Sequence, residues 1–171
     1  MYGMSHGLIH ILQANWQVLQ RLPSQWARPC KYIATERGEL MEEFKVSTSS
    51  RTEMIDITGE VADAVKRTGV NHGVVTVYCP HTTGGITINE GADPMVKRDI
   101  LHVLNSIVPW DSDYRHMEGN SPAHIKTLLT GSSVQVILQG GRLCLGTWQR
   151  IFFCEYDGPR KRKVWIEVTG K

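Results

Sequence analysis

The chain has 171 residues, of which 41% are hydrophobic and 21% charged, a composition typical of one ordinary globular domain with a core. Its formal net charge of +2 is too small to indicate a nucleic acid or an anionic membrane as a partner. No apolar run approaches the roughly 18 residues that span a membrane, and the N-terminus lacks the pattern of a signal peptide, so we expect a cytoplasmic protein.

Residues 1–40 differ in composition from the rest of the chain. They hold four of the seven glutamines and only two of the acidic residues, whereas residues 41–171 carry 15 basic and 15 acidic residues. From Met41 the sequence resembles the beginning of a protein whose first element is a strand. We therefore predict that residues 41–171 form one α+β domain, and that residues 1–40 are a poorly ordered extension or follow from a wrongly assigned start. A docked N-terminal arm is the alternative.

Hydrophobic periodicity and turn residues predict the elements that follow. In chain order they are a strand at 44–50, a helix at 55–68, strands at 73–79 and 86–89, helices at 93–108 and 121–130, and strands at 134–138, 143–145, 148–156 and 163–168. The helix at 93–108 is expected to bury Met95, Ile100, Leu101, Leu104 and Ile107 or Val108. Because helices and strands do not alternate regularly, this order favours an α+β fold with a largely antiparallel sheet.

The segment Pro80-His81-Thr82-Thr83-Gly84-Gly85 directly follows a predicted buried strand. Strand ends are usual places for binding sites, because a rigid element aims the side chains. The glycines let the backbone approach a ligand and offer its N–H groups to an oxyanion or a phosphate. Taken alone the signal is weak, since a histidine after a strand is more often structural. Glu90 is a further candidate, because it closes the next strand rather than opening a helix.

The segment His116-Met-Glu118-Gly-Asn120-Ser121-Pro-Ala-His124 is the most informative one. Asn120 or Ser121 caps a helix, which places His124 in the first turn, where free N–H groups favour anions. His116 and Glu118 precede the cap and can converge on the same point.

The histidines allow two kinds of chemistry. His81, His116 and His124 together with a carboxylate suit Zn²⁺ or another divalent metal with an open coordination position. A neutral histidine can instead act as a general acid or base near pH 7. Both interpretations stay open. Further along the chain, Gln149 and Arg160 flank a predicted hairpin and could reach a phosphate.

Four segments taken together resemble the YjbQ-like proteins, a family assigned as secondary thiamine-phosphate synthases. They are HTTGGITINEGADP at 81–94, HMEGNSPAHIK at 116–126, LGTWQ at 145–149 and EYDGPRKRKV at 155–164. The resemblance covers essentially all of residues 41–171 and none of residues 1–40.

This resemblance implies an α+β fold whose largely antiparallel sheet is curled into a barrel-like shape with about three helices packed on it. It also implies a homotrimer with sites near subunit boundaries, and either a divalent metal such as Zn²⁺ or Mg²⁺ or an anion at the histidines. The implied activity couples a hydroxymethylpyrimidine pyrophosphate to a thiazole phosphate and releases pyrophosphate. The expected catalytic residues are His81, Glu90, His116 and Glu118, and those expected to bind the phosphorylated substrate are Thr82, Thr83, Asn120, Ser121, Gln149 and Arg160.

Two other functions stay open from the residues alone. In a metal-dependent hydrolase or phosphate-handling enzyme, the three histidines would hold Zn²⁺ and Glu118 or Glu90 would activate water. In a non-catalytic trimeric protein, the same groups would bind a small anion. The synthase itself would need a hold on the leaving pyrophosphate, yet the sequence lacks the acidic cluster that usually holds Mg²⁺ on a diphosphate.

Overall fold

The computed structural model describes residues 41–171, so the prediction for residues 1–40 lies outside the described residues. Eight strands and three helices make up the described chain. In order they are β1 (Met41–Ser47), β2 (Glu53–Asp56), α2 (Thr58–Thr68), β3 (His72–Tyr78), β4 (Gly84–Glu90), α3 (Pro94–Ile107), α4 (Ser121–Thr130), β5 (Ser133–Gln139), β6 (Arg142–Leu143), β7 (Gln149–Glu155) and β8 (Lys161–Gly170).

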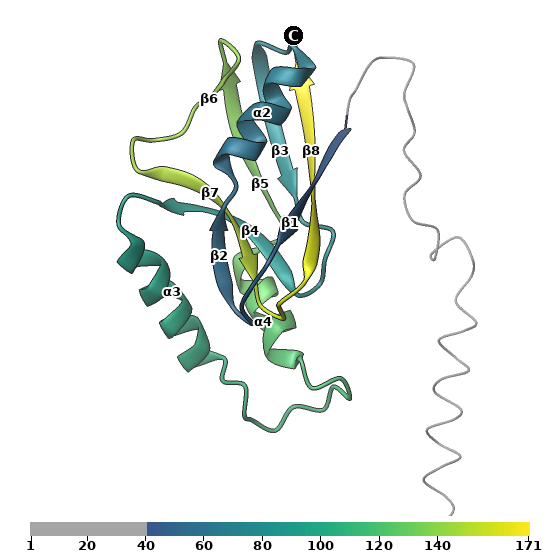
Figure 1. Ribbon diagram of the computed structural model, residues 1–171, viewed down its shortest axis with the longest axis vertical. Coiled ribbons are helices and arrows are strands. Elements are labelled where there is room, and N and C mark those ends of the chain that lie inside the picture. Colours follow the sequence, from purple (N-terminus) through teal and green to yellow (C-terminus); the bar gives the residue numbers. More distant parts are fainter. Residues whose placement is uncertain (1–40) are drawn as a thin grey trace, which may run out of the picture. The chain divides into compact units, whose positions relative to one another are not determined.

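The strands form two sheets, and every pair of neighbours is antiparallel. One sheet has the order β1-β8-β3-β5-β6, and the other has the order β2-β7-β4. Figure 1 shows the long strands of the first sheet side by side, with β8 between β1 and β3. The predicted α+β fold with a curled antiparallel sheet and about three helices is confirmed.

The main core lies between the two sheets and α2. It is built from β-branched and aromatic side chains that alternate along the strands, such as Val75 and Val77 on β3 and Val164 and Ile166 on β8, all of which are almost inaccessible to solvent. Helix α2 adds Val61, Ala64 and Val65 from one face.

Strand β7 is the middle strand of its sheet, and packed side chains cover both of its faces. Ile151 and Phe153 enter the main core, whereas Phe152 and Cys154 point to the other side, into a second cluster with Ala123 of α4. Apolar side chains of α3 cover this second cluster. The three-stranded sheet therefore lies between the main core and the layer of α3 and α4 (Figure 1).

Two helix starts differ in how the sequence specifies them. Asp93 caps α3 as predicted, because its Oδ1 accepts a hydrogen bond from the backbone N–H of Met95 at 2.8 Å. The first helix begins at Thr58 and not at Ile55, since the short strand β2 occupies Glu53–Asp56 and pairs with β7. Four residues without clear alternation gave no strand signal, so the prediction missed β2.

The prediction for the buried face of α3 was wrong at Met95, whereas of the two residues offered at the other end, Val108 is buried and Ile107 is not. Met95 and Ile107 are exposed, and no residue of α3 is fully buried. Only the middle of the helix packs on the second cluster, through Ile100, Leu101 and Leu104. Helix α3 is therefore the one helix of residues 41–171 without a fully buried residue. Within the same residues, no helix is long and apolar enough to cross a membrane.

Candidate functional site

His81 lies just beyond the end of β3, where its imidazole replaces a missing strand partner. Strands β3 and β8 pair as far as Tyr78 opposite Trp165, after which β3 ends. Two residues earlier on β8, the backbone N–H of Lys163 donates a hydrogen bond of 2.8 Å to Nε2 of His81. The ring is therefore held against the edge of β8 by a main-chain contact.

His81 and His124 line one cavity, which we call the histidine pocket. It has a volume of about 470 Å³ and lies between the segment after β3 and one side of α4. Its lining consists of Tyr78, Cys79, Pro80, His81, Thr82, His124, Thr127, Leu128, Gly131 and Ser132. The ring of His116 meets that of His124 edge to face, with the centroids 5.3 Å apart. The structure thus brings two of the three predicted histidines to one pocket and places the third beside them.

The side chains do not fit a preformed metal site in one protomer. Nε2 of His81 already accepts the hydrogen bond from Lys163. Across residues 41–171, no three His, Cys, Asp or Glu side chains are arranged to hold a metal ion. A metal at His81, His116 and His124 stays a prediction from the sequence.

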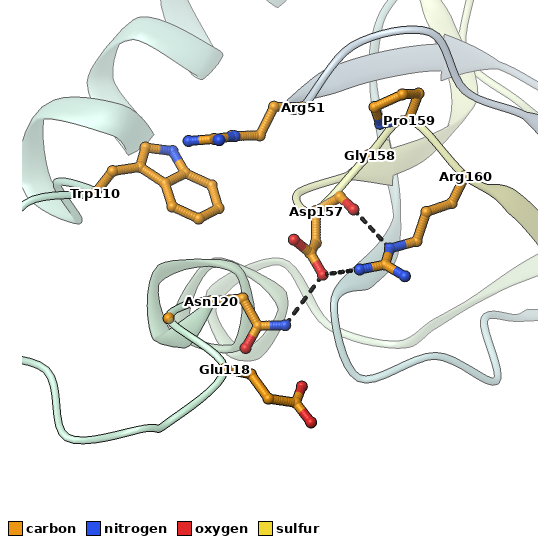
Figure 2. Close-up of a pocket in the computed structure, with 9 residues that line it drawn as sticks. Arg51, Trp110, Glu118, Asn120, Asp157, Gly158, Pro159 and Arg160 are labelled. Atoms are coloured by element: carbon orange, nitrogen blue, oxygen red, sulfur yellow. Dashed lines mark hydrogen bonds and ion pairs between the residues drawn. The ribbon is translucent and has the colours of Figure 1, made fainter.

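A second cavity, which we call the arginine pocket, lies at the start of α4. It has a volume of about 440 Å³ and is lined by Arg51, Trp110, Glu118, Gly119, Asn120, Asp157, Gly158, Pro159 and Arg160. The guanidinium carbon of Arg51 lies 4.7 Å from the centroid of the Trp110 ring, a cation–π contact. Figure 2 shows these two side chains together on one wall of the pocket.

The opposite wall is held by the carboxylate of Asp157. Its Oδ2 accepts hydrogen bonds from Nη2 of Arg160 at 2.7 Å and from Nδ2 of Asn120 at 3.0 Å, so the carboxylate lies between the two side chains (Figure 2). Asn120 is the N-cap residue of α4, but its side chain accepts no hydrogen bond from the backbone of the helix. No acceptor within residues 41–171 takes the backbone N–H of Asn120 or Ser121.

A buried ion pair connects the surroundings of the two pockets. Arg162 donates to Glu155 through Nε at 2.7 Å and Nη2 at 2.5 Å, and its Nη2 also reaches Oγ1 of Thr83 at 2.9 Å. The same carboxylate accepts the backbone N–H of Tyr156 and of Asp157. The same ion pair thus contacts both pockets' surroundings: Arg162 donates to Thr83, next to the histidine pocket, and Glu155 accepts from the backbone of Asp157, in the arginine pocket.

Several predicted site residues have other positions. Thr83 was expected to bind substrate, but it is buried and its hydroxyl accepts from Arg162, so it supports the fold. Glu90 pairs with Gln149 at one end of β4, whereas Gly84 near the histidines lies at the other end. At about 3.3 Å per residue this separation is about 20 Å. Within one protomer, the structure therefore does not bring Glu90 or Gln149 to the histidine pocket.

The remaining predicted residues divide between the two pockets. Thr82 lines the histidine pocket, and Asn120 and Arg160 line the arginine pocket. Glu118 also lines the arginine pocket, and its Oε2 lies 3.8 Å from Nε2 of His116. Ser121 begins α4 directly after Asn120.

Sequence reasoning missed Arg51, Trp110, Glu155 and Arg162. Arg162 had a usable signal, because the strand alternation that buries Val164 and Ile166 also turns Arg162 inward. Arg51 and Trp110 had none, since they meet from loops that are far apart in the chain.

Comparison with known proteins identifies relatives over the described part of the chain. The model of the family described as UPF0047 protein YjbQ-like matches residues 42–171. UPF0047 protein YugU of Bacillus subtilis is 50% identical over 132 residues, which are 77% of this chain and all of the relative. UPF0047 protein MJ1081 of Methanocaldococcus jannaschii is 44% identical over 132 residues, 77% of this chain and 96% of the relative.

Solved structures agree with these matches. A YjbQ/UPF0047 family protein from Clostridium acetobutylicum is 54% identical with a TM-score of 0.74, and the match covers 75% of this chain and 99% of that one. A YbjQ-like protein of unknown function from Sulfolobus solfataricus is 29% identical with a TM-score of 0.75, and the match covers 78% and 98%.

These findings overturn one prediction and establish one identity. The expected thiamine-phosphate synthase activity was wrong as an assignment, because the relatives carry only the designation UPF0047 and one solved neighbour is described as of unknown function. The family model and the identities over residues 42–171 agree on the relationship. By sequence and by fold, this chain belongs to the UPF0047 YjbQ-like family.

Proposed function

We propose that this protein binds a small phosphorylated molecule through the arginine pocket. The observation that supports this most directly is the guanidinium of Arg51. It contacts the Trp110 ring, yet it makes no ion pair or hydrogen bond with any residue of 41–171. A guanidinium has five N–H donors in a planar fork that matches phosphate oxygens, so these donors are free for a ligand.

Other groups of the pocket favour the same ligand. Asn120 lines the pocket, and its backbone N–H lies at the start of α4, where the helix dipole adds partial positive charge. Asp157 does not neutralise Arg51, because its carboxylate already accepts from Arg160 and Asn120. The other acid, Glu118, has a side chain that is 76% exposed and lies at the rim.

The size of the pocket is suitable for a small molecule. Ligand pockets commonly have volumes of about 300–1,000 Å³, and the arginine pocket has about 440 Å³. The stacked Trp110 ring fixes the plane of the Arg51 guanidinium and so reduces the entropy that a ligand contact must offset.

Calorimetric titration of the full chain with inorganic phosphate and with pyrophosphate tests the proposal. Because a charge-assisted hydrogen bond contributes about 1.5–3 kcal/mol, Arg51→Gln should weaken binding about tenfold or more. Arg67→Gln is the matched control, since Arg67 is half exposed and pairs with Glu42 away from the pocket. Equal affinity in wild type and Arg51→Gln, or no binding by wild type, would contradict the proposal.

Catalysis and oligomeric state are further proposals. An enzymatic reaction stays a prediction, for which the histidine pocket offers two imidazoles that share a cavity. The implied homotrimer is supported by exposed apolar side chains on α4, where Leu128 is 81% and Leu129 57% exposed.

A further inference from the structure

We propose that the histidine pocket binds an uncharged group of a ligand by an oxygen acceptor, with Nδ1–H of a neutral His81 as the fixed donor. This inference concerns a different cavity from the arginine pocket and does not depend on phosphate binding there. It assigns His81 the role of a hydrogen-bond donor, in place of the metal ligand or general base expected from the sequence.

The contact with β8 determines which ring nitrogen carries the proton. Because the backbone N–H of Lys163 can only donate, Nε2 of His81 must be the unprotonated nitrogen that accepts. In a neutral imidazole the proton then resides on Nδ1. No group within residues 41–171 forms a hydrogen bond with Nδ1, and Nδ1 is not fully shielded from solvent. The donor is therefore free and accessible.

The surroundings of His81 favour the neutral ring that its hydrogen bond with the Lys163 N–H requires. Burial lowers the pKa of His81 below its ordinary value, and the nearby guanidinium of Arg162 lowers it further. Arg162 cannot move away, because it is held by two hydrogen bonds to Glu155 and one to Thr83. Arg162 is therefore a positioning residue, which acts on the pocket through His81.

The lining of the pocket selects an uncharged partner. No lysine, arginine, aspartate or glutamate lines it, and burial raises the pKa of the Cys79 thiol to about 11, so the thiol stays protonated. Leu128, Pro80 and the ring of Tyr78 provide apolar surface. Burying an anion without a cation beside it is costly, whereas a carbonyl oxygen needs only a donor. The hydroxyl of Thr127, which is buried without a hydrogen-bond partner, is a second polar group at this wall.

Long-range ¹H–¹⁵N correlation NMR of the uniformly labelled full chain tests the tautomer directly. At pH 7 we expect Nδ1 of His81 to resonate as a protonated nitrogen and Nε2 as an unprotonated one. A protonated Nε2, or a doubly protonated ring at pH 7, would overturn the proposal. The measurement needs no variant, no ligand and no activity.

Titration with N-methylacetamide and with acetate tests the class of ligand. We expect the amide to shift the backbone resonances of Thr82, which the variants at position 81 retain, more than acetate does. His81→Asn should retain this response, because its side-chain amide places an N–H donor near the position of Nδ1, whereas His81→Ala should lose it. A larger response to acetate, equal responses of the two variants, or no response to either probe up to its solubility limit would overturn the assignment. Phosphate binding at the arginine pocket is measured separately, so the two proposals fail independently.

Discussion

Arg162 and Glu155 form a two-contact ion pair inside the protein, with Nε to Oε2 at 2.7 Å and Nη2 to Oε1 at 2.5 Å. Their side chains are 7% and 0% exposed. Every carboxylate oxygen has a further donor, because Thr48 reaches Oε2 and two backbone N–H groups reach Oε1. A pair that is satisfied in this way holds the ends of β1, β7 and β8 together beneath both pockets.

Removal of one member of this pair should destabilise the fold strongly. Arg162→Met leaves the Glu155 carboxylate buried without its cation, and such losses cost about 3–5 kcal/mol. Urea denaturation should show this loss, while Arg67→Met, which breaks the exposed pair with Glu42, should cost about 1 kcal/mol or less. Similar values for the two variants would show that the buried pair does not stabilise the fold in this way.

The stability of the protein should fall on mild acidification because of His81. Its pKa is lowered in the folded state, by burial first and by Arg162 second. The unfolded chain therefore binds a proton at His81 at a higher pH than the folded chain does. The contribution is fully present above the unfolded pKa of about 6.5 and is lost as the pH falls toward the folded pKa.

Urea midpoints measured between pH 8 and pH 5 check this dependence. His81→Gln keeps a side-chain acceptor near the Lys163 N–H but cannot titrate, so its stability should fall less between pH 7 and pH 5 than that of the wild type. If the two curves run parallel, His81 is not the group responsible.

Gly85 should not tolerate a side chain, although it lies in a strand. An added Cβ would meet the carbonyl oxygen of Gly131 at 2.6 Å and Cγ2 of Thr130 at 3.0 Å, both at the end of α4. Gly85→Ala should therefore cost about 1–3 kcal/mol in urea denaturation. Gly59→Ala, in α2 with nothing within 4 Å, should instead stabilise by about 0.5 kcal/mol. A harmless Gly85→Ala would show that α4 is not fixed against β4 at this point.

The exposed apolar face of α4 gives a test of the predicted homotrimer. Leu128→Glu places a charge on a side chain that is 81% exposed, so it should leave the fold intact and disrupt subunit association. Light scattering coupled to size-exclusion chromatography should then show a monomer. Lys66→Glu, on α2 at a charged side chain that is 71% exposed, is the control that should keep the trimer. A wild-type monomer would rule out the trimer.

The elements with strong local signals were predictable from the sequence. The helix predicted at 93–108 matches α3, which Asp93 caps and Pro94 begins, and between the strands predicted at 134–138 and 143–145 both Gly140 and Gly141 turn the chain with positive φ. The extent to which helix α3 is buried could not be predicted from the sequence. Its apolar periodicity indicates that one face avoids water, but it does not tell how much of that face a single protomer covers. Met95 was therefore expected to be buried and is exposed, and of the pair Ile107 or Val108 only Val108 is buried.

The candidate site was predictable only in part. His81 and His124 line one pocket, and each lies beside an element whose position was predicted closely. The prediction that Glu90 joins them ignored the length of β4, which separates the two ends of the strand within one protomer. The contact between Arg51 and Trp110 depends on two loops meeting in space, and no local pattern encodes such a meeting.

Helices α3 and α4 are needed to cover one face of strand β7. Its run Ile151-Phe152-Phe153-Cys154 has no polar face, so one side depends entirely on what α3 and α4 provide. A short segment rich in aromatic and β-branched residues is prone to self-association when it becomes accessible. Because α3 contributes no fully buried residue, its detachment should cost little free energy, and it would expose Phe152 to solvent. Heating should therefore lead to irreversible aggregation before the main core between the sheets melts.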